Sequence, residues 1–171
     1  MQASPLELET YYLESLKWSL SSSFDASEDE VRLALSAEEI ECDVQRADLE
    51  APRYAAYRLQ LSSKSLEGKP QPYDWEIVLV GYFRLHDTVP DDRVIALMDG
   101  NAPAVLFGAA REAIATALSR GPFRAPMLPG VNFMNLQRND AKAALVAAKK
   151  EAKASKTLKT PTKKRAAKQK S

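Results

Sequence analysis

The chain changes its hydrophobic period once, and that change limits the folds open to it. Across the first half, apolar and polar residues alternate with a period of two in four segments, residues 11–24, 39–49, 54–65 and 75–86. A period of two places successive side chains on opposite faces of a strand. Short connections separate the last three segments, whereas parallel neighbours need crossovers of about a dozen residues. The first half therefore predicts a four-stranded antiparallel sheet.

The first and last of these segments differ in how many faces are apolar. In residues 11–24 the apolar side chains share one parity, which predicts one buried face made of Tyr12, Leu16, Trp18, Leu20 and Phe24. Residues 75–86 are apolar on both parities, as is usual for a central strand covered on both sides. A chain of this size has too few elements to cover two sheet faces and a helix stripe. Uncovered apolar surface favours association, so we expect an oligomer with hydrophobic grooves.

Helical spacing follows the strands. Asn101 is predicted to cap a helix, Pro103 to lie in its first turn and Gly121 to end it. Between them the apolar residues recur at three and four positions, at Leu106, Phe107, Ala110, Ile114, Ala117 and Leu118. A proline-rich loop occupies residues 122–133, and a second helix rich in alanine and lysine is predicted from about residue 134 to about 155. The predicted fold class is α+β, a four-stranded antiparallel sheet followed by two helices.

Charge is distributed unevenly along the chain. Residues 141–171 hold 11 Lys or Arg and one acid, Glu151, which leaves 13 basic and 22 acidic residues in the preceding part. We expect a folded domain over residues 1–140, and the end of the second helix with a basic, disordered tail over residues 141–171. Such opposed charge favours contact of the tail with nucleic acid, with an acidic surface, or with the chain's own acidic domain.

Residues suited to catalysis or metal binding are scarce. Cys42 and His86 are the only cysteine and histidine, too few for a standard zinc site. The glycine-rich phosphate loops and the GxSxG elbow are absent as well. We therefore predict a protein without enzymatic activity, metal or cofactor, in which Cys42 is an inward-facing apolar residue rather than a nucleophile.

The start of the chain and its cysteine content bear on location. The segment MQASPLELETYYLE has neither the basic start nor the apolar core of a secretory signal. No apolar run approaches the roughly 20 residues that span a bilayer. With a single cysteine, no internal disulfide can form. We expect a soluble protein in the reducing cytoplasm.

Several short motifs resemble the SecB protein-export chaperone family. Residues 106–112 read LFGAARE, residues 120–123 read RGPF and residues 131–133 read VNF, which match the family's L-F-x-x-A-R-E, R-G-x-F and V-N-F. A further match is EIVLVGYF at residues 76–83, similar to E-[VI]-x-x-x-G-x-F. The resemblance covers about residues 10–145. Two features depart from it: Gly130 stands where the family usually has proline, and the tail is strongly basic.

The resemblance implies a fold and a function. The subunit would be α+β, assemble as a homotetramer made of two dimers, and lack catalytic activity. It would act without ATP, holding unfolded preproteins in apolar grooves, keeping them competent for translocation and passing them to the SecA motor. Some relatives protect an antitoxin, so a dedicated chaperone of a toxin–antitoxin system is one alternative. An alternative of a different class is nucleic-acid binding through the basic residues between positions 142 and 170.

The resemblance also suggests roles for individual residues. Positions that affect tetramer assembly in the family correspond to Trp75, Ile77 and Leu79, which implies an interface or core role. Glu76, on the opposite parity, matches an acidic position implicated in SecA docking. For the peptide-binding groove we favour Trp18, Tyr82, Phe107 and Phe123. The period of the strands does not tell which sheet face is core and which is groove.

Overall fold

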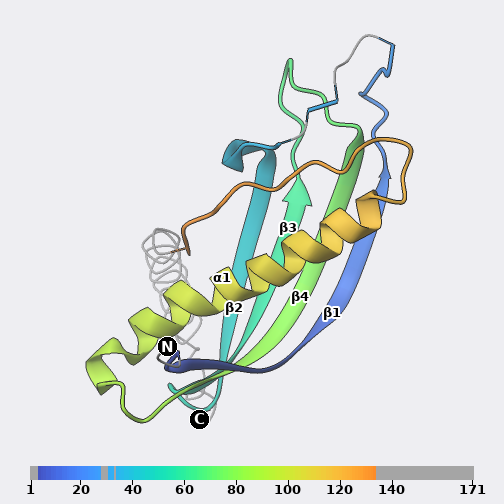
Figure 1. Cartoon of the computed structure of the whole chain (residues 1–171). Coiled ribbons are helices and arrows are strands. Elements are labelled where there is room, and N and C mark those ends of the chain that lie inside the picture. The colour runs from blue at the N-terminus through green and yellow to red at the C-terminus, as the bar shows by residue number, and fades with distance from the viewer. Residues whose placement is uncertain (1–3, 28–30, 33, 134–171) are drawn as a thin grey trace, which may run out of the picture. The chain divides into compact units, whose positions relative to one another are not determined.

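The computed structural model describes residues 4–27, 31–32 and 34–133. The elements in chain order are β1 (Leu6–Leu20), a short 3₁₀ turn η1 (Ala37–Glu39), β2 (Ile40–Ala51), β3 (Tyr54–Ser63), β4 (Tyr73–Leu85) and α1 (Asp91–Leu118) (Figure 1). A four-stranded antiparallel sheet followed by a helix confirms the α+β class. The predicted second helix and basic tail lie outside the described residues.

The strand order β1-β4-β3-β2 makes the most apolar strand central. β4 pairs with β1 on one side and with β3 on the other, and all pairings are antiparallel. β1 and β2 are consecutive in the sequence but lie at opposite edges of the sheet. The connection between them, residues 21–39, therefore passes the ends of β4 and β3 (Figure 1). We call it the crossover segment.

The helix α1 packs on one face of the sheet, here called the inner face, and the hydrophobic core lies between them (Figure 1). Gly81 of β4 allows the closest approach, since a Cβ atom there would lie 2.7 Å from Cδ2 of Leu106. The buried helix positions recur every four residues, and the strands supply alternate residues. The core includes Val94, Met98, Ala102, Leu106, Ala110, Ile114 and Leu118 of α1, Ala55, Tyr57, Leu59 and Leu61 of β3, and Trp75, Ile77, Leu79, Phe83 and Leu85 of β4.

The start predicted for the helix is wrong. α1 begins at Asp91, ten residues before Asn101, and Pro103 lies inside it. The reason is the buried ridge, which already includes Val94 and Met98 and therefore holds the earlier turns on the sheet. The Asn101 side chain does not cap a terminus but donates a hydrogen bond to the Leu97 carbonyl at 2.7 Å.

Two groups of polar contacts connect the first half of α1 to the rest of the subunit. The Arg53 guanidinium donates to the carbonyl oxygens of His86 and Val89, at 3.1 and 2.8 Å, and pairs with Asp91 at the start of the helix. Further along, Asp99 accepts hydrogen bonds from the Tyr57 hydroxyl and from Arg46, the latter at 2.7 Å. Burial, followed by the hydrogen bond to Asp99, raises the pKa of Tyr57.

β1 differs from its prediction in bounds, parity and burial. The strand ends at Leu20, so Phe24 lies in the crossover segment rather than in the strand. Its pairing with β4 shifts register after Leu8 and again after Leu13, and each such bulge reverses the parity that follows. Tyr12 consequently pairs with Val80 on the outer face, while Trp18 pairs with Trp75 on the inner face.

The predicted buried face of β1 is exposed in the subunit. Trp18 is 39% exposed and Leu20 is 53% exposed. The cause is the position of β1 at the sheet edge, because α1 packs mainly against the central strand β4.

The outer face of the sheet carries polar side chains over a small apolar centre. Val78 and Val80 of β4 are buried there. Arg58 of β3 pairs with Glu14 of β1 at 3.0 Å, so this ion pair reaches across β4 on the outer face. The second apolar parity of β4 is thus partly covered by polar side chains of the same sheet. Within the described part of the chain, no helix is long and apolar enough to cross a membrane.

Candidate functional site

Four aromatic side chains from four separate segments meet at one end of the sheet. We call them the aromatic corner: Trp18 of β1, Phe24 of the crossover segment, Tyr73 of β4 and Phe123 of the loop after α1. Their ring centroids lie 5.7 Å apart for Trp18 and Tyr73, 6.2 Å for Tyr73 and Phe123, and 5.1 Å for Phe24 and Phe123. The contacts are edge-to-face, a favourable arrangement for aromatic rings.

Tyr73 is the centre of this corner and is fully buried. Its hydroxyl donates to the Phe123 carbonyl oxygen at 2.7 Å and accepts from the Phe123 amide at 2.8 Å. The loop after α1 is thereby held by its backbone. Gly121 permits this approach, because a Cβ atom there would lie 2.8 Å from Cε1 and Cζ of Tyr73 and closer still to the hydroxyl.

The crossover segment contacts the same loop. The Leu35 amide donates to the Met127 carbonyl at 3.0 Å, within an isolated parallel bridge between Ala34 and Met127. At the start of the segment, the Ser21 amide donates to the Pro72 carbonyl at 3.0 Å. The crossover segment and the loop therefore form one wall beside the aromatic corner.

A buried carboxylate holds the crossover segment in place through several hydrogen bonds. Glu39 is completely buried and pairs with Arg32, and it accepts hydrogen bonds from the Ser36 amide and hydroxyl at 2.8 and 2.9 Å. Gln71, in the connection before β4, donates to it at 3.5 Å. The hydrogen bond from Arg32, more than any other contact, lowers the pKa of Glu39 to about 2.

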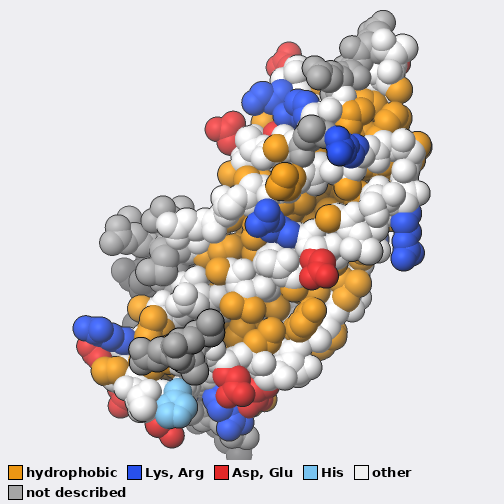
Figure 2. Space-filling model, viewed as in Figure 1, with side chains coloured by type: hydrophobic (Ala, Val, Ile, Leu, Met, Phe, Trp, Pro, Cys, Tyr) orange, Lys and Arg blue, Asp and Glu red, His pale blue; other side chains and the backbone are white. Residues whose placement is uncertain are grey.

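An apolar stripe leads along β1 to the aromatic corner. The register places its members on the inner face beyond the edge of α1, where they are half or more than a third exposed: Tyr11 at 50%, Leu13 at 47%, Trp18 at 39% and Leu20 at 53%. We call these four residues the β1 stripe. Figure 2 shows hydrophobic side chains gathered beside α1 on this face. Among the described strands, none pairs with the other edge of β1, and an open strand edge is a surface on which another chain can pair.

The structure brings two of the four predicted peptide-binding residues together. Trp18 and Phe123 both belong to the aromatic corner. Phe107 is buried in contact with Phe133, with ring centroids 5.6 Å apart, and Tyr82 lies on the outer face, where it pairs with Thr10. Tyr82 and Phe107 are therefore separate from the corner.

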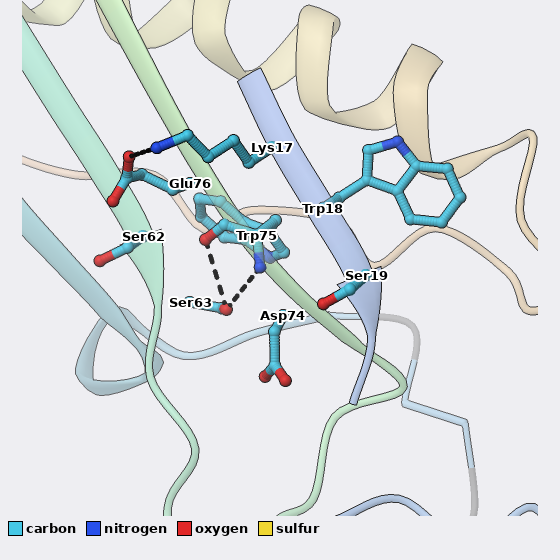
Figure 3. A pocket seen from close by; sticks show the side chains of 8 residues that line it. All are labelled: Lys17, Trp18, Ser19, Ser62, Ser63, Asp74, Trp75 and Glu76. Atoms are coloured by element: carbon cyan, nitrogen blue, oxygen red, sulfur yellow. Dashed lines mark hydrogen bonds and ion pairs between the residues drawn. The ribbon is translucent and has the colours of Figure 1, made fainter. Parts of the chain in front are cut away.

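The other predicted site residues lie on the two faces of β4. Trp75, Ile77 and Leu79 are buried on the inner face under α1. Of the two predicted roles, interface or core, this position within one subunit corresponds to the core. Glu76 projects from the outer face and pairs with Lys17 at 3.5 Å, at the shallow hollow drawn in Figure 3.

A second hollow lies between α1 and the loop that follows it. It has a volume of about 310 Å³ and is lined by Arg111 and Glu112 on α1 and by Met127 and Leu128 on the loop. Met127 is 62% exposed there. Arg111 and Glu112, both part of the LFGAARE motif, thus border an open surface next to apolar side chains.

The single cysteine and the single histidine of the chain lie far apart in the sheet. Cys42 of β2 aligns through Leu61 with Ile77 of β4, whereas His86 follows Leu85 at the far end of that strand. Eight residues of strand separate the two levels by roughly 26 Å, too far for a nucleophile and its base. Among the described residues, no three His, Cys, Asp or Glu side chains are grouped so as to hold a metal ion.

Comparison with known proteins gives a family match over most of the chain. The model of the family described as "Preprotein translocase subunit SecB" matches residues 6–144. Curated relatives named "Protein-export protein SecB" include one from Rhodopseudomonas palustris strain HaA2, 33% identical over 86 residues, and one from strain BisB18, 38% identical over 85 residues. These alignments cover 50% and 48% of this chain, and 54% and 51% of the relatives. The chain thus spans about half the length of the curated relatives it matches.

Among solved structures, one similar chain is the Mycobacterium tuberculosis Rv1957 SecB-like chaperone in complex with a ChAD peptide from the Rv1956 HigA1 antitoxin. It is 11% identical, with a TM-score of 0.47, and the match covers 74% of this chain and 90% of that one. A Streptococcus agalactiae protein of unknown function is 12% identical, with a TM-score of 0.37, over 74% of this chain and 94% of the other.

Proposed function

Because the chain belongs to the SecB family, we propose that it is an ATP-independent chaperone which binds unfolded polypeptides and keeps them competent for export. The observation that carries the proposal is the exposed apolar β1 stripe, which reaches the aromatic corner through Trp18. Hydrophobic contact is non-directional, and backbone hydrogen bonds are independent of sequence, so such a surface accepts many unfolded segments.

The same physics explains how such a chaperone acts without nucleotide. A protein that binds only the unfolded state of a client lowers the free energy of that state, by an amount that grows with the concentration of free chaperone relative to its dissociation constant. Folding and aggregation of the client are then delayed, and release follows dilution or transfer to a tighter partner. The free energy of client binding is therefore sufficient for this activity, without nucleotide hydrolysis.

Assembly forms part of the proposal, because the edge of β1 is unpaired. Long apolar edge strands are rarely left open in solution. We propose that the middle of β1, at Tyr11 and Leu13, pairs with a second copy and that the subunits form a homotetramer. The aromatic corner, at the end of the strand, then remains for clients. Trp75, Ile77 and Leu79 would support this assembly from the core by shaping the strand next to β1.

Transfer of the client involves the opposite face of the sheet. We propose that Glu76, which is on the outer face, belongs to a docking surface for SecA in the cytoplasm. Its pairing with Lys17 is between exposed side chains and therefore weak, so a cationic partner group can replace the lysine.

The proposal is tested with the purified full-length chain and a denatured client. At a few-fold molar excess the chain is expected to suppress aggregation of the client and delay its refolding, equally with and without ATP. Failure to do either would reject the chaperone function. Suppression confined to one antitoxin would instead support the dedicated toxin–antitoxin chaperone, and binding of nucleic acid alone would support the other class.

The aromatic corner and the middle of β1 give separable predictions. Trp18→Ala is expected to weaken client binding about tenfold, because a central aromatic contact is commonly worth about 1 to 2 kcal/mol. The oligomeric mass of this variant is expected to stay the same. Leu13→Asp is expected to reduce the mass instead. Fluorescence titration with a labelled unfolded client and light scattering measure the two effects. Leu49→Ala, which truncates an exposed apolar residue of β2, is the matched control. Equal affinity of Trp18→Ala and this control would remove the corner from the client site.

A further inference from the structure

The two methionines in the described part of the chain differ sharply in their access to solvent. Met127, in the loop after α1, is 62% exposed, whereas Met98 of α1 is completely buried in the core. A thioether that solvent reaches is also reached by small oxidants, which convert it to a sulfoxide. The fold therefore presents one accessible thioether and protects another, with which it can be compared.

Met127 lines the hollow between α1 and the loop, which has a volume of about 310 Å³. The helix contributes Gly108, Arg111, Glu112 and Ala115 to the lining, and their spacings of three and four place them on one helix face. Two of these four have little or no side chain, and even a Cβ atom added at Gly108 would meet nothing within 4 Å. The hollow therefore has room for an oxygen atom on the sulfur of Met127.

Arg111 brings hydrogen-bond donors to the same hollow. Its side chain is half-buried, and within the described residues its guanidinium forms no ion pair or hydrogen bond, not even with the neighbouring Glu112. A guanidinium carries five N–H donors, whereas the thioether of Met127 is only a weak acceptor. A sulfoxide oxygen at this position would be a much stronger acceptor and would give Arg111 a partner.

The backbone of Met127 is held independently of its side chain. Its carbonyl oxygen accepts a hydrogen bond from the Leu35 amide at 3.0 Å, within the bridge between Ala34 and Met127. The next residue, Leu128, is only 3% exposed. The flexible side chain of methionine can reorient without moving this backbone. Oxidation at Met127 is therefore compatible with the fold, whereas a sulfoxide at a core methionine disrupts packing.

We infer that Met127 is a reversible oxidation site whose sulfoxide oxygen accepts a hydrogen bond from Arg111 and holds the loop against α1. With hydrogen peroxide, a lone pair of the sulfur attacks one peroxide oxygen, so that the S–O bond forms and the O–O bond breaks. The proton on the transferred oxygen passes to the leaving hydroxide, which departs as water. The sulfur loses two electrons and the peroxide gains them. Methionine sulfoxide reductases reverse the change.

The first test identifies the methionine that is oxidised. It uses the full-length chain with Met134→Leu, which leaves Met127 as the only methionine in its tryptic peptide, and with Cys42→Ala, which removes a competing thiol. Under hydrogen peroxide, peptide mapping by mass spectrometry is expected to show Met127 oxidised at least about tenfold faster than Met98. In urea the two rates should become equal. Equal rates in the folded protein would overturn the inference.

The second test measures the contact between the sulfoxide and Arg111. Oxidation is expected to raise the thermal unfolding midpoint by about 2 °C or more at one fixed protein concentration. Arg111→Leu should abolish this rise, and Arg111→Lys, which keeps a cationic donor, should retain part of it. Glu112→Leu, which changes the neighbouring residue of the same hollow, is the matched control and should keep the rise.

Two outcomes of the second test would contradict the inference. One is an unfolding midpoint that does not rise when Arg111 is present. The other is a rise of the same size in Arg111→Leu, which would show that the sulfoxide gains its stability elsewhere. Both measurements are made without a client, so the oxidation site and the proposed chaperone function can each fail without the other.

Discussion

Gly121→Ala is expected to destabilise the chain by about 2 kcal/mol and to weaken client binding. An added Cβ would lie 2.8 Å from two ring carbons of Tyr73, closer than such atoms approach. Relief by rotation of the ring is restricted, because Tyr73 is fully buried and its hydroxyl makes two hydrogen bonds to Phe123. Either those hydrogen bonds break or the loop moves. Overpacking of this kind typically costs about 1 to 3 kcal/mol.

The same loop offers a matched control for this substitution. Gly130 has open space at the position of a Cβ atom, so Gly130→Ala is expected to change stability by less than about 0.5 kcal/mol. Thermal and urea unfolding at one fixed protein concentration, together with client titration, measure both variants. Equal stability of the two would show that the contact between Gly121 and Tyr73 does not hold the loop.

Glu39→Ala is expected to destabilise the chain more strongly, by about 3 kcal/mol. The substitution leaves Arg32 without its partner and removes the acceptor of two hydrogen bonds from Ser36. Removing one member of a fully buried ion pair usually costs about 3 to 5 kcal/mol, and the lower end applies here because the Arg32 side chain is 32% exposed. The crossover segment is expected to detach first, which protease cleavage within residues 31–36 would detect. Glu38→Ala, at the exposed neighbour, is the control and should have little effect.

The lowered pKa of Glu39 also predicts how the stability of the fold changes in acid. Its pKa is lowered from 4.5 to about 2 in the folded state, so the unfolded state binds a proton first as the pH falls. The carboxylate therefore contributes its full stability above about pH 4.5, and this contribution decreases to zero by about pH 2. In Glu39→Gln this component should be missing, and its unfolding midpoint should fall less between pH 5 and pH 2 or so. Parallel curves for the two proteins would contradict the assignment.

The strand order could be anticipated in part from the sequence. β4 is apolar on both parities, and this correctly indicated a central strand. The faces of β1 were harder to predict. Its inward-facing apolar residues recur every two positions, except for steps of three from Leu8 to Tyr11 and from Leu13 to Leu16. Those two steps coincide with the bulges. Strict period-two reasoning through them assigned Tyr12 to the wrong face.

The helix start shows how a local signal can compete with a longer one. Asn101 and Pro103 have the spacing of a capping residue and a first-turn proline, and that local pattern suggested a start. The four-residue repeat that includes Val94 and Met98 extends further towards the N-terminus and buries more apolar surface. Tertiary packing therefore determined the observed boundary.

The candidate site was only partly visible in the sequence. Trp18 and Phe123 were selected for their aromatic side chains and do meet, but Tyr73, which joins them, lies before the predicted start of its strand. Its contact with Gly121 depends on segments nearly 50 residues apart, which local pattern reasoning does not connect. Glu39 had a usable signal, since Ser36 and Glu39 have the spacing of a capping box.

The pairing of β1 with β4 has a consequence for how the molecule acquires its function. β2, β3 and β4 are joined by short connections and can form early, whereas Trp18 pairs with Trp75 only after a loop of more than 50 residues closes. We expect β1 to join late, so that Leu16→Ala accelerates unfolding and leaves the refolding rate nearly unchanged in stopped-flow measurements. A slower refolding rate would place β1 in the nucleus instead. On this order of events, a newly made subunit has no aromatic corner until its last strand docks, and the proposed capacity to hold another unfolded chain arises only when its own folding is complete.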